Sequence, residues 1–146
     1  MSDSWIDDLL STADSDFKSD DKWERGAFNM VGGKSKSLKH IIPKLPFSKD
    51  MIWVDHFAGT GVVSFNIRPF GKVNVINDRY SAICDFYRCV RDDLDQFLDY
   101  LQRFPWHSRQ QWEESYSEWN TYEDPIRRSA HWYYFWRSSV LGKGKY

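Results

Sequence analysis

Two glycines and two acids have the spacing of a site that binds a nucleoside. The first acid, Asp55, follows the apolar run 51–54, and Gly59 and Gly61 come next in an Ala-Gly-Thr-Gly turn. Glycine adopts backbone angles that other residues avoid and lets a ligand approach the main chain closely. Free N–H groups where a helix begins attract electron-rich groups. Strand, acid, glycine turn and helix in this order are typical of a nucleotide or dinucleoside cofactor site, although such a turn alone is a weak signal.

The second acid is Asp78, nineteen positions after Gly59. It follows the alternating segment 72–76 (KVNVI), which predicts a second strand. An acid about 20 residues after the glycine turn, at the end of the next strand, is where ribose hydroxyls are bound. The alternative is that the pair Asn77-Asp78 only caps the next helix, which we expect to begin near Ser81. With both halves of the pattern present, we favour the ribose role.

The elements that must hold these residues can be read from the apolar pattern. The run 51–54 (MIWV) has no polar alternation, which predicts a strand buried on both faces of a parallel sheet. Apolar residues resume directly after the glycine turn, as at the start of a helix. Segment 36–45 places four apolar residues on one helical face, and Pro46 ends it. Lys34, beside two glycines at the start of that helix, could hold a carboxylate, but the residues alone favour an exposed surface lysine.

The second half of the chain predicts helices. From Ser81 to about residue 101, apolar residues recur every three or four positions, which indicates one helix or two nearly continuous ones. Segment 108–120 carries an aromatic stripe at the same spacing, more typical of core than of a binding surface. Asp124 as cap and Pro125 in the first turn predict a last helix that runs to about Leu141, where Gly142 stops it.

Three segments together resemble the S-adenosylmethionine site of Dam-type adenine-specific DNA methyltransferases. They are MVGGKSKSLKHIIPKLP (30–46), VDHFAGTGVV (54–63) and VINDRY (75–80), in the family's order and at compatible separations. His56 departs from the proline common at that position. The resemblance implies an α/β fold: a partial Rossmann-like methyltransferase sheet with helices, leading into a helical target-recognition region. It divides the chain into an acidic extension (1–24), a partial cofactor-binding core (25–100) and the start of the recognition region (101–146).

The resemblance also implies a role for each matched residue. Asp78 would bind the ribose hydroxyls of S-adenosylmethionine, and Phe57, Gly59 and Gly61 would wrap the cofactor. Asp55 would lie near the methionine amine. The same resemblance favours cofactor contact for Lys34, which with Met30 would close over the methionine end.

Double-stranded DNA is the partner that the resemblance implies. No acid follows Asp124, whereas basic residues do. Arg137, Lys143 and Lys145 would meet DNA phosphates, a contact that positions a protein without reading sequence. Binding by this chain alone is expected to be weak.

The family's catalytic Asp-Pro-Pro-Tyr motif does not occur in the 146 residues. Asp124-Pro125 is not that motif, since Ile126 and Arg127 follow it. We therefore expect the N-terminal part of an adenine-specific DNA methyltransferase, ending before the catalytic loop, inactive alone and able to pair with a missing C-terminal half. One alternative is a non-catalytic S-adenosylmethionine-binding regulatory or decoy module, and another is a nucleotide-binding protein of unrelated chemistry, against which the Gly-Gly-Lys segment argues.

Composition adds a few limits. The formal net charge of −1 gives no global attraction to nucleic acid, and residues 1–24 hold eight acids, which predicts a mostly mobile acidic extension. Cys84 and Cys89, the two cysteines, fall five apart in one predicted helix, so we expect no disulfide, and the sequence shows no zinc pattern. Neither a membrane-length apolar run nor a signal peptide is evident. These features favour a reduced, cytoplasmic protein.

Overall fold

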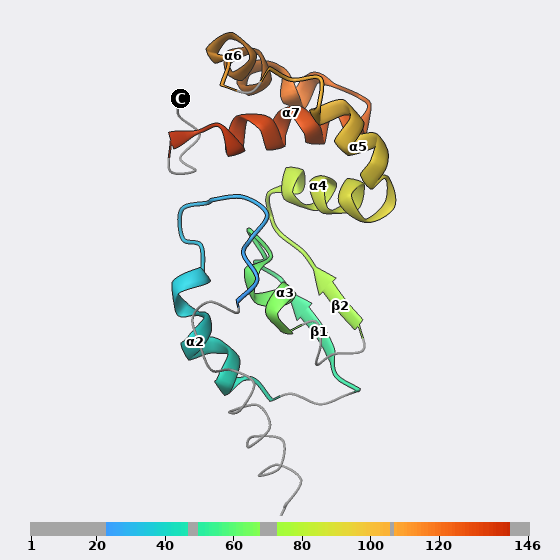
Figure 1. Cartoon of the computed structure of the whole chain (residues 1–146). Helices are drawn as coiled ribbons and strands as arrows, with labels where there is room; N and C mark the ends of the chain where they lie inside the picture. The colour runs from blue at the N-terminus through green and yellow to red at the C-terminus, as the bar shows by residue number, and fades with distance from the viewer. Residues whose placement is uncertain (1–22, 47–49, 68–72, 106, 141–146) are drawn as a thin grey trace, which may run out of the picture.

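The computed structural model describes residues 23–46, 50–67, 73–105 and 107–140. A pair of parallel strands lies at one end of a group of helices, with α2 and α3 beside the strands and α4 to α7 gathered beyond them (Figure 1). Helices with a small parallel sheet agree with the predicted α/β class. Most of the predicted acidic extension, residues 1–22, lies outside the described residues. The elements in chain order are η2 (Ser35–Ser37), α2 (Leu38–Ile41), η3 (Ile42–Lys44), β1 (Ile52–Asp55), α3 (Val62–Ile67), β2 (Val73–Ile76), α4 (Ser81–Asp92), α5 (Leu94–Leu101), α6 (Arg109–Glu118), η5 (Trp119–Thr121) and α7 (Pro125–Arg137).

Strands β1 and β2 are parallel, with Ile52 opposite Val73 and Asp55 opposite Ile76. Parallel strands need a crossover connection, and α3 lies between them in the chain. The order predicted from the sequence, strand, glycine turn, helix and second strand, is confirmed. The first strand begins and ends one residue later than predicted.

One face of this strand pair is exposed, so the predicted burial of the first strand on both faces is wrong. Ile52 is 65% exposed, Val54 41% and Val75 43%. On the opposite face Trp53 is half-buried and donates a hydrogen bond from its indole Nε1 to Ser64 Oγ of α3, at 3.1 Å. An apolar strand is buried on both sides only where helices cover both faces. Among the described residues, α3 and its cluster pack against the strand on the face that carries Trp53.

The helix predicted over 36–45 is present as three short pieces, η2, α2 and η3. Pro43 accounts for the last break, because it has no N–H to donate and its ring crowds the preceding turn. The predicted apolar face is nevertheless buried. Leu38 and Ile42 pack with three residues of α3 in one cluster, Val62, Val63 and Ile67.

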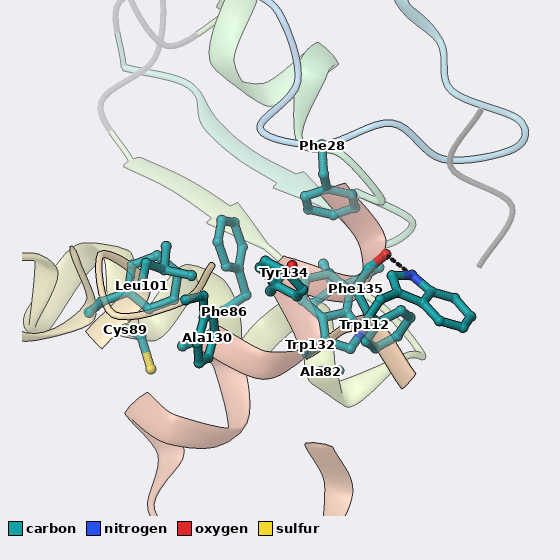
Figure 2. Packing of buried hydrophobic residues seen from close by; sticks show 13 residues of the cluster. Phe28, Ala82, Phe86, Cys89, Leu101, Trp112, Ala130, Trp132, Tyr134 and Phe135 are labelled. Carbon is teal, nitrogen blue, oxygen red and sulfur yellow. Dashed lines mark hydrogen bonds between the residues drawn. The ribbon is translucent and has the colours of Figure 1, made fainter. Parts of the chain in front are cut away.

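A second, larger cluster holds the helices together and is rich in aromatic rings (Figure 2). Its members come from α4, α5, α6 and α7, and Phe104 from the loop after α5 and Phe28 from the N-terminal segment join them. The Phe28 ring meets Phe86 of α4 at 5.7 Å and Trp132 of α7 at 5.0 Å, both edge to face. The segment that precedes the sheet is therefore anchored in the helical region.

The helices of the second half agree with the periodic pattern, and α4 and α5 are the two nearly continuous helices expected. The aromatic stripe of α6 is only partly core. Trp112 is 9% exposed and donates from Nε1 to the Phe135 carbonyl at 3.0 Å (Figure 2), whereas Tyr116 is 53% exposed. The Tyr116 ring instead stacks on Trp112 at the edge of the cluster, 5.0 Å between centroids.

Helix α7 begins as predicted and ends earlier than predicted. The Asp124 carboxylate accepts hydrogen bonds from the backbone N–H groups of Ile126 and Arg127, with Pro125 in the first turn. The helix ends at Arg137 rather than near Leu141, which lies outside the described residues. The Ser139 hydroxyl donates to the Phe135 carbonyl, and such local side-chain bonds compete with helix continuation.

Candidate functional site

The site forms where the two strands end. Because β1 and β2 are parallel, Asp55 and the Asn77-Asp78 pair leave the sheet at the same edge. The Asn77 N–H donates to the Asp55 carbonyl at 2.8 Å, which extends the strand pairing by one residue. The chain leaves both strands at this edge, and open α/β sheets bind their ligands outside the carboxyl ends of the strands.

The glycine turn is fastened to the end of the second strand. The Ala58 N–H donates to the Asn77 carbonyl at 3.0 Å, and the Gly59 N–H donates to Asp78 Oδ2 at 2.9 Å. Gly59 has a φ of +51°, in the left-handed region that glycine adopts without steric cost. The other carboxylate oxygen, Asp78 Oδ1, accepts from the Tyr80 N–H at 2.9 Å, so Asp78 also orders the approach to α4. The capping alternative is wrong, because the N-cap of α4 is Tyr80 and no side chain caps this helix.

The segment 30–34 closes over this turn. The Gly33 N–H donates to the Met30 carbonyl at 3.1 Å in a tight turn. Lys34 Nζ then reaches across and donates to the Phe57 carbonyl, also at 3.1 Å. Met30 lies over the glycine turn, since a Cβ added to Gly59 would sit 3.8 Å from its sulfur. Two segments distant in the sequence therefore form the walls of one hollow.

That hollow is a cleft of about 180 Å³. Five of the seven residues predicted to bind the cofactor line it, namely Met30, Lys34, Phe57, Gly59 and Asp78. The cleft is smaller than the roughly 300–1,000 Å³ usual for ligand pockets, so it can enclose only part of a cofactor-sized ligand. The Phe57 ring, 76% exposed, stands at its edge and offers an apolar surface to the remainder.

Gly61 does not line the cleft, and packing explains why it is glycine. A Cβ there would lie 2.7 Å from Tyr87 Oη and 2.8 Å from the Phe65 ring, and its φ is +68°. The Tyr87 hydroxyl is buried with no hydrogen-bond partner among the described residues. Burial raises the pKa of this hydroxyl, and the nearby Asp55 charge adds to the effect. It therefore remains protonated.

Asp55 is likewise not among the residues that line the cleft. Its carboxylate accepts from the Phe57 N–H at 3.2 Å and from the Ser64 hydroxyl at 3.0 Å. Both bonds run to residues of the glycine turn and of α3. In this structure Asp55 fixes the shape of the turn, and its contact with a methionine amine stays a prediction.

The residues predicted to meet DNA are described only in part. Arg137 is exposed at the end of α7, while Lys143 and Lys145 lie outside the described residues. The structure also adds residues that the sequence analysis did not single out. Ala58 and Thr60, both buried, line the cleft along with Val31 and Val62. Each of these four residues is next to a glycine in the sequence, and this position could have marked them as candidates for the site.

A buried Ser–His pair in the helical region has no access to a substrate. Ser115 Oγ and His131 Nδ1 lie 3.0 Å apart, and their residues are 0% and 2% exposed. Burial lowers the pKa of His131 to about 4, with a further contribution from the Arg127 charge and an opposing one from Glu118. The imidazole is neutral and serves packing. Within the described part of the chain, no group of three or more His, Cys, Asp or Glu side chains could hold a metal ion.

A strand pair with a glycine turn and an acid at its carboxyl edge is an arrangement typical of α/β proteins that bind nucleoside cofactors. The family model for D12 class N6 adenine-specific DNA methyltransferases matches residues 31–143. The chain belongs to this family, which confirms the resemblance inferred from the three motifs, and the family implies adenine-specific methylation of DNA. Curated proteins gave no match to the sequence. Of the helices in the described ranges, none has the length and apolar character needed to cross a membrane.

Proposed function

We propose that the cleft binds S-adenosylmethionine, as the cofactor half of an adenine-specific DNA methyltransferase. The observation that carries this proposal is the convergence of Met30, Lys34, Phe57, Gly59 and Asp78, from three separate segments, on one cleft. Membership of the family supplies the reaction class, methyl transfer to the N6 amine of adenine in DNA. When bound, S-adenosylmethionine supplies the methyl group from its sulfonium.

Asp78 suits a ribose diol because only part of its hydrogen-bonding capacity is used. An ionised carboxylate has about four acceptor positions on its two oxygens. Gly59 and Tyr80 N–H groups occupy one position on each oxygen. The remaining position on each can accept one of two adjacent hydroxyls, and the two backbone bonds hold the carboxylate in place meanwhile.

The opposite wall suits the amino-acid end of the cofactor. The Lys34 ammonium has three donors, and one is used by the Phe57 carbonyl. The other two can bind a carboxylate by charge-assisted hydrogen bonds. Met30 and the exposed Phe57 ring would cover the apolar atoms between the two polar ends.

The sheet suits a larger Rossmann-like arrangement. Ile52, Val54 and Val75 form an exposed apolar face on a strand pair, and such faces are normally covered in a parallel sheet. We infer that a further layer covers this face in the active enzyme and brings the Asp-Pro-Pro-Tyr loop, which these 146 residues lack. That loop holds the target amine of an adenine extruded from the duplex, because a stacked base cannot reach the methyl group. The chain alone would then bind cofactor without transferring methyl.

A non-catalytic module that binds S-adenosylmethionine is the second candidate. The absence of the catalytic motif favours it, and it uses the same cleft. The two candidates differ in whether the chain gains activity when a segment with the catalytic loop is supplied. They agree on the cofactor.

Photochemical cross-linking tests the shared claim. The chain is irradiated with S-adenosylmethionine carrying a tritiated methyl group, digested, and the labelled peptides are identified. We expect label in peptides that contain residues 30–34 or 57–60, suppressed by excess S-adenosylhomocysteine. Label elsewhere, or label that the competitor does not reduce, would contradict the site.

A further inference from the structure

A second hollow, separate from the cleft, is lined by basic side chains. It is a groove of about 440 Å³ between the segment Trp23–Arg25 and the helical run that begins at Ser35. One stretch of chain contributes to both: its residues up to Lys34 line the cleft, and its residues from Ser35 onward line the groove. We call it the basic groove.

Three exposed cations line the basic groove, Arg25, Lys36 and Lys39, against one acid, Glu24. None of the three forms an ion pair with a carboxylate of the described residues, whereas Arg88, Arg91, Arg109 and Arg128 do. Lys36 and Lys39 are three positions apart in the helical run, so they are neighbours on its surface, about 5–6 Å apart at Cβ. The groove thus presents two adjacent ammonium groups and a guanidinium, with a net positive charge.

The walls of the basic groove are held in place. The Glu24 N–H donates to Asn66 Oδ1 at 2.9 Å, and Asn66 Nδ2 donates back to the Glu24 carbonyl at 3.0 Å. Asn66 belongs to α3, which also packs against Leu38 on the other wall. Both walls are therefore fastened to the same helix, and the spacing of the cations across the groove is set by the fold.

We propose that the basic groove binds backbone phosphates of the DNA substrate beside the cofactor cleft. This inference rests on the proposed function, in which DNA is brought to the cleft. Phosphates are the anions that unpaired lysine and arginine side chains bind in series along a strand, with release of counterions. Contact at the groove would place the duplex against the mouth of the cleft without reading its sequence.

The acidic segment at the N-terminus is the competing occupant. Residues 1–21 hold seven acids and precede Trp23, which lines the groove. DNA is favoured because the family implies a DNA substrate. If the acidic segment filled the groove instead, neutralising the cations would not weaken DNA binding.

The test is the salt dependence of DNA binding by the full chain. Fluorescence anisotropy of a labelled mixed-sequence duplex is measured over a range of NaCl concentrations, for the parent and for Lys36→Gln/Lys39→Gln. Loss of two phosphate contacts should make the slope of log K against log[NaCl] shallower by about 1.8 and lower the affinity about tenfold or more near 0.1 M salt. The control Lys44→Gln/Arg91→Gln removes the same charge at exposed positions outside the groove lining and should change the slope little.

Other results would overturn the proposal. An unchanged slope in the folded groove variant, equal loss in the control, tighter DNA binding by the groove variant, or no DNA binding by the parent would each contradict it. Calorimetry with S-adenosylmethionine separates the two proposals. Retained cofactor binding with an unchanged slope contradicts the groove alone, and absence of cofactor binding by the parent contradicts the proposed function.

Discussion

The Gly59 N–H donates to the Asp78 carboxylate at 2.9 Å across nineteen positions of sequence. This bond joins the two halves of the motif that the sequence predicts. It fixes the glycine turn and orients the acid at once. A substitution in either half should therefore disturb the other.

Gly61→Ala should destabilise the chain more than Gly32→Ala. Both positions have positive φ, +68° and +82°, so both substitutions add backbone strain of about 1–3 kcal/mol. At Gly61 the new methyl group would also meet Tyr87 and Phe65, at about 1–3 kcal/mol for overpacking, whereas nothing lies within 4 Å at Gly32. Urea denaturation measures both free energies of unfolding. Equal losses would show that Gly61 is required by conformation alone.

Ile52→Thr should change the free energy of unfolding by about 0.5 kcal/mol or less, as exposed substitutions do, because Ile52 is 65% exposed. The matched change Ile67→Thr, at a residue 0% exposed, should cost about 1–3 kcal/mol for the buried hydroxyl. Thermal melts of the two variants against the parent provide the comparison. A loss at Ile52 as large as that at Ile67 would mean that this sheet face is covered in solution.

Stability should fall as pH is lowered from about 6.5 to about 4, through His131. Its pKa is about 4 in the folded chain and near the usual 6.5 when unfolded, so in this interval only the unfolded state takes up the proton. The effect is complete below the folded pKa and amounts to at most about 3 kcal/mol. Urea melts at stepped pH, compared with His131→Gln, measure it. A parent profile as flat as that of the variant over this interval would contradict the assignment.

The chain alone should transfer no methyl group to DNA. It lacks the Asp-Pro-Pro-Tyr loop that would hold the target amine. An adenine of bound DNA would therefore not be held with its amine against the methyl group of the cofactor. A tritiated-methyl transfer assay on mixed-sequence duplex DNA measures this directly. Robust turnover would show that another group holds the amine, and would overturn our proposal that the catalytic loop comes from elsewhere.

Local patterns predicted more of the molecule than its long-range contacts did. The strand, the glycine turn, the Asp124 cap and the helices follow from periodicity and capping residues, which act over a few positions. The bond from Lys34 to the Phe57 carbonyl could not be predicted, because it joins segments 23 residues apart through a main-chain oxygen. The last break in the helical run 35–44, between α2 and η3, was signalled by Pro43, which a count of apolar positions overlooks.

Burial was the least predictable property. The run 51–54 indicates a strand with two covered faces, and the exposed Ile52 and Val54 show that the described residues cover one. The apolar pattern indicates that both faces of the strand need to be covered, but it does not indicate which segments cover them. Likewise, the role of Gly61 depends on Tyr87, a residue of α4 whose approach no local spacing reveals.

The central claim is that Asp78 holds the ribose of S-adenosylmethionine, and calorimetric titration of the cofactor tests it most directly. Parent, Asp78→Asn and the control Asp99→Asn, an exposed acid of α5, are compared, with circular dichroism confirming that each is folded. Charge-assisted hydrogen bonds contribute about 1.5–3 kcal/mol each, so Asp78→Asn should weaken binding tenfold or more, while Asp99→Asn should match the parent. Unchanged affinity in folded Asp78→Asn would contradict the assignment of the site.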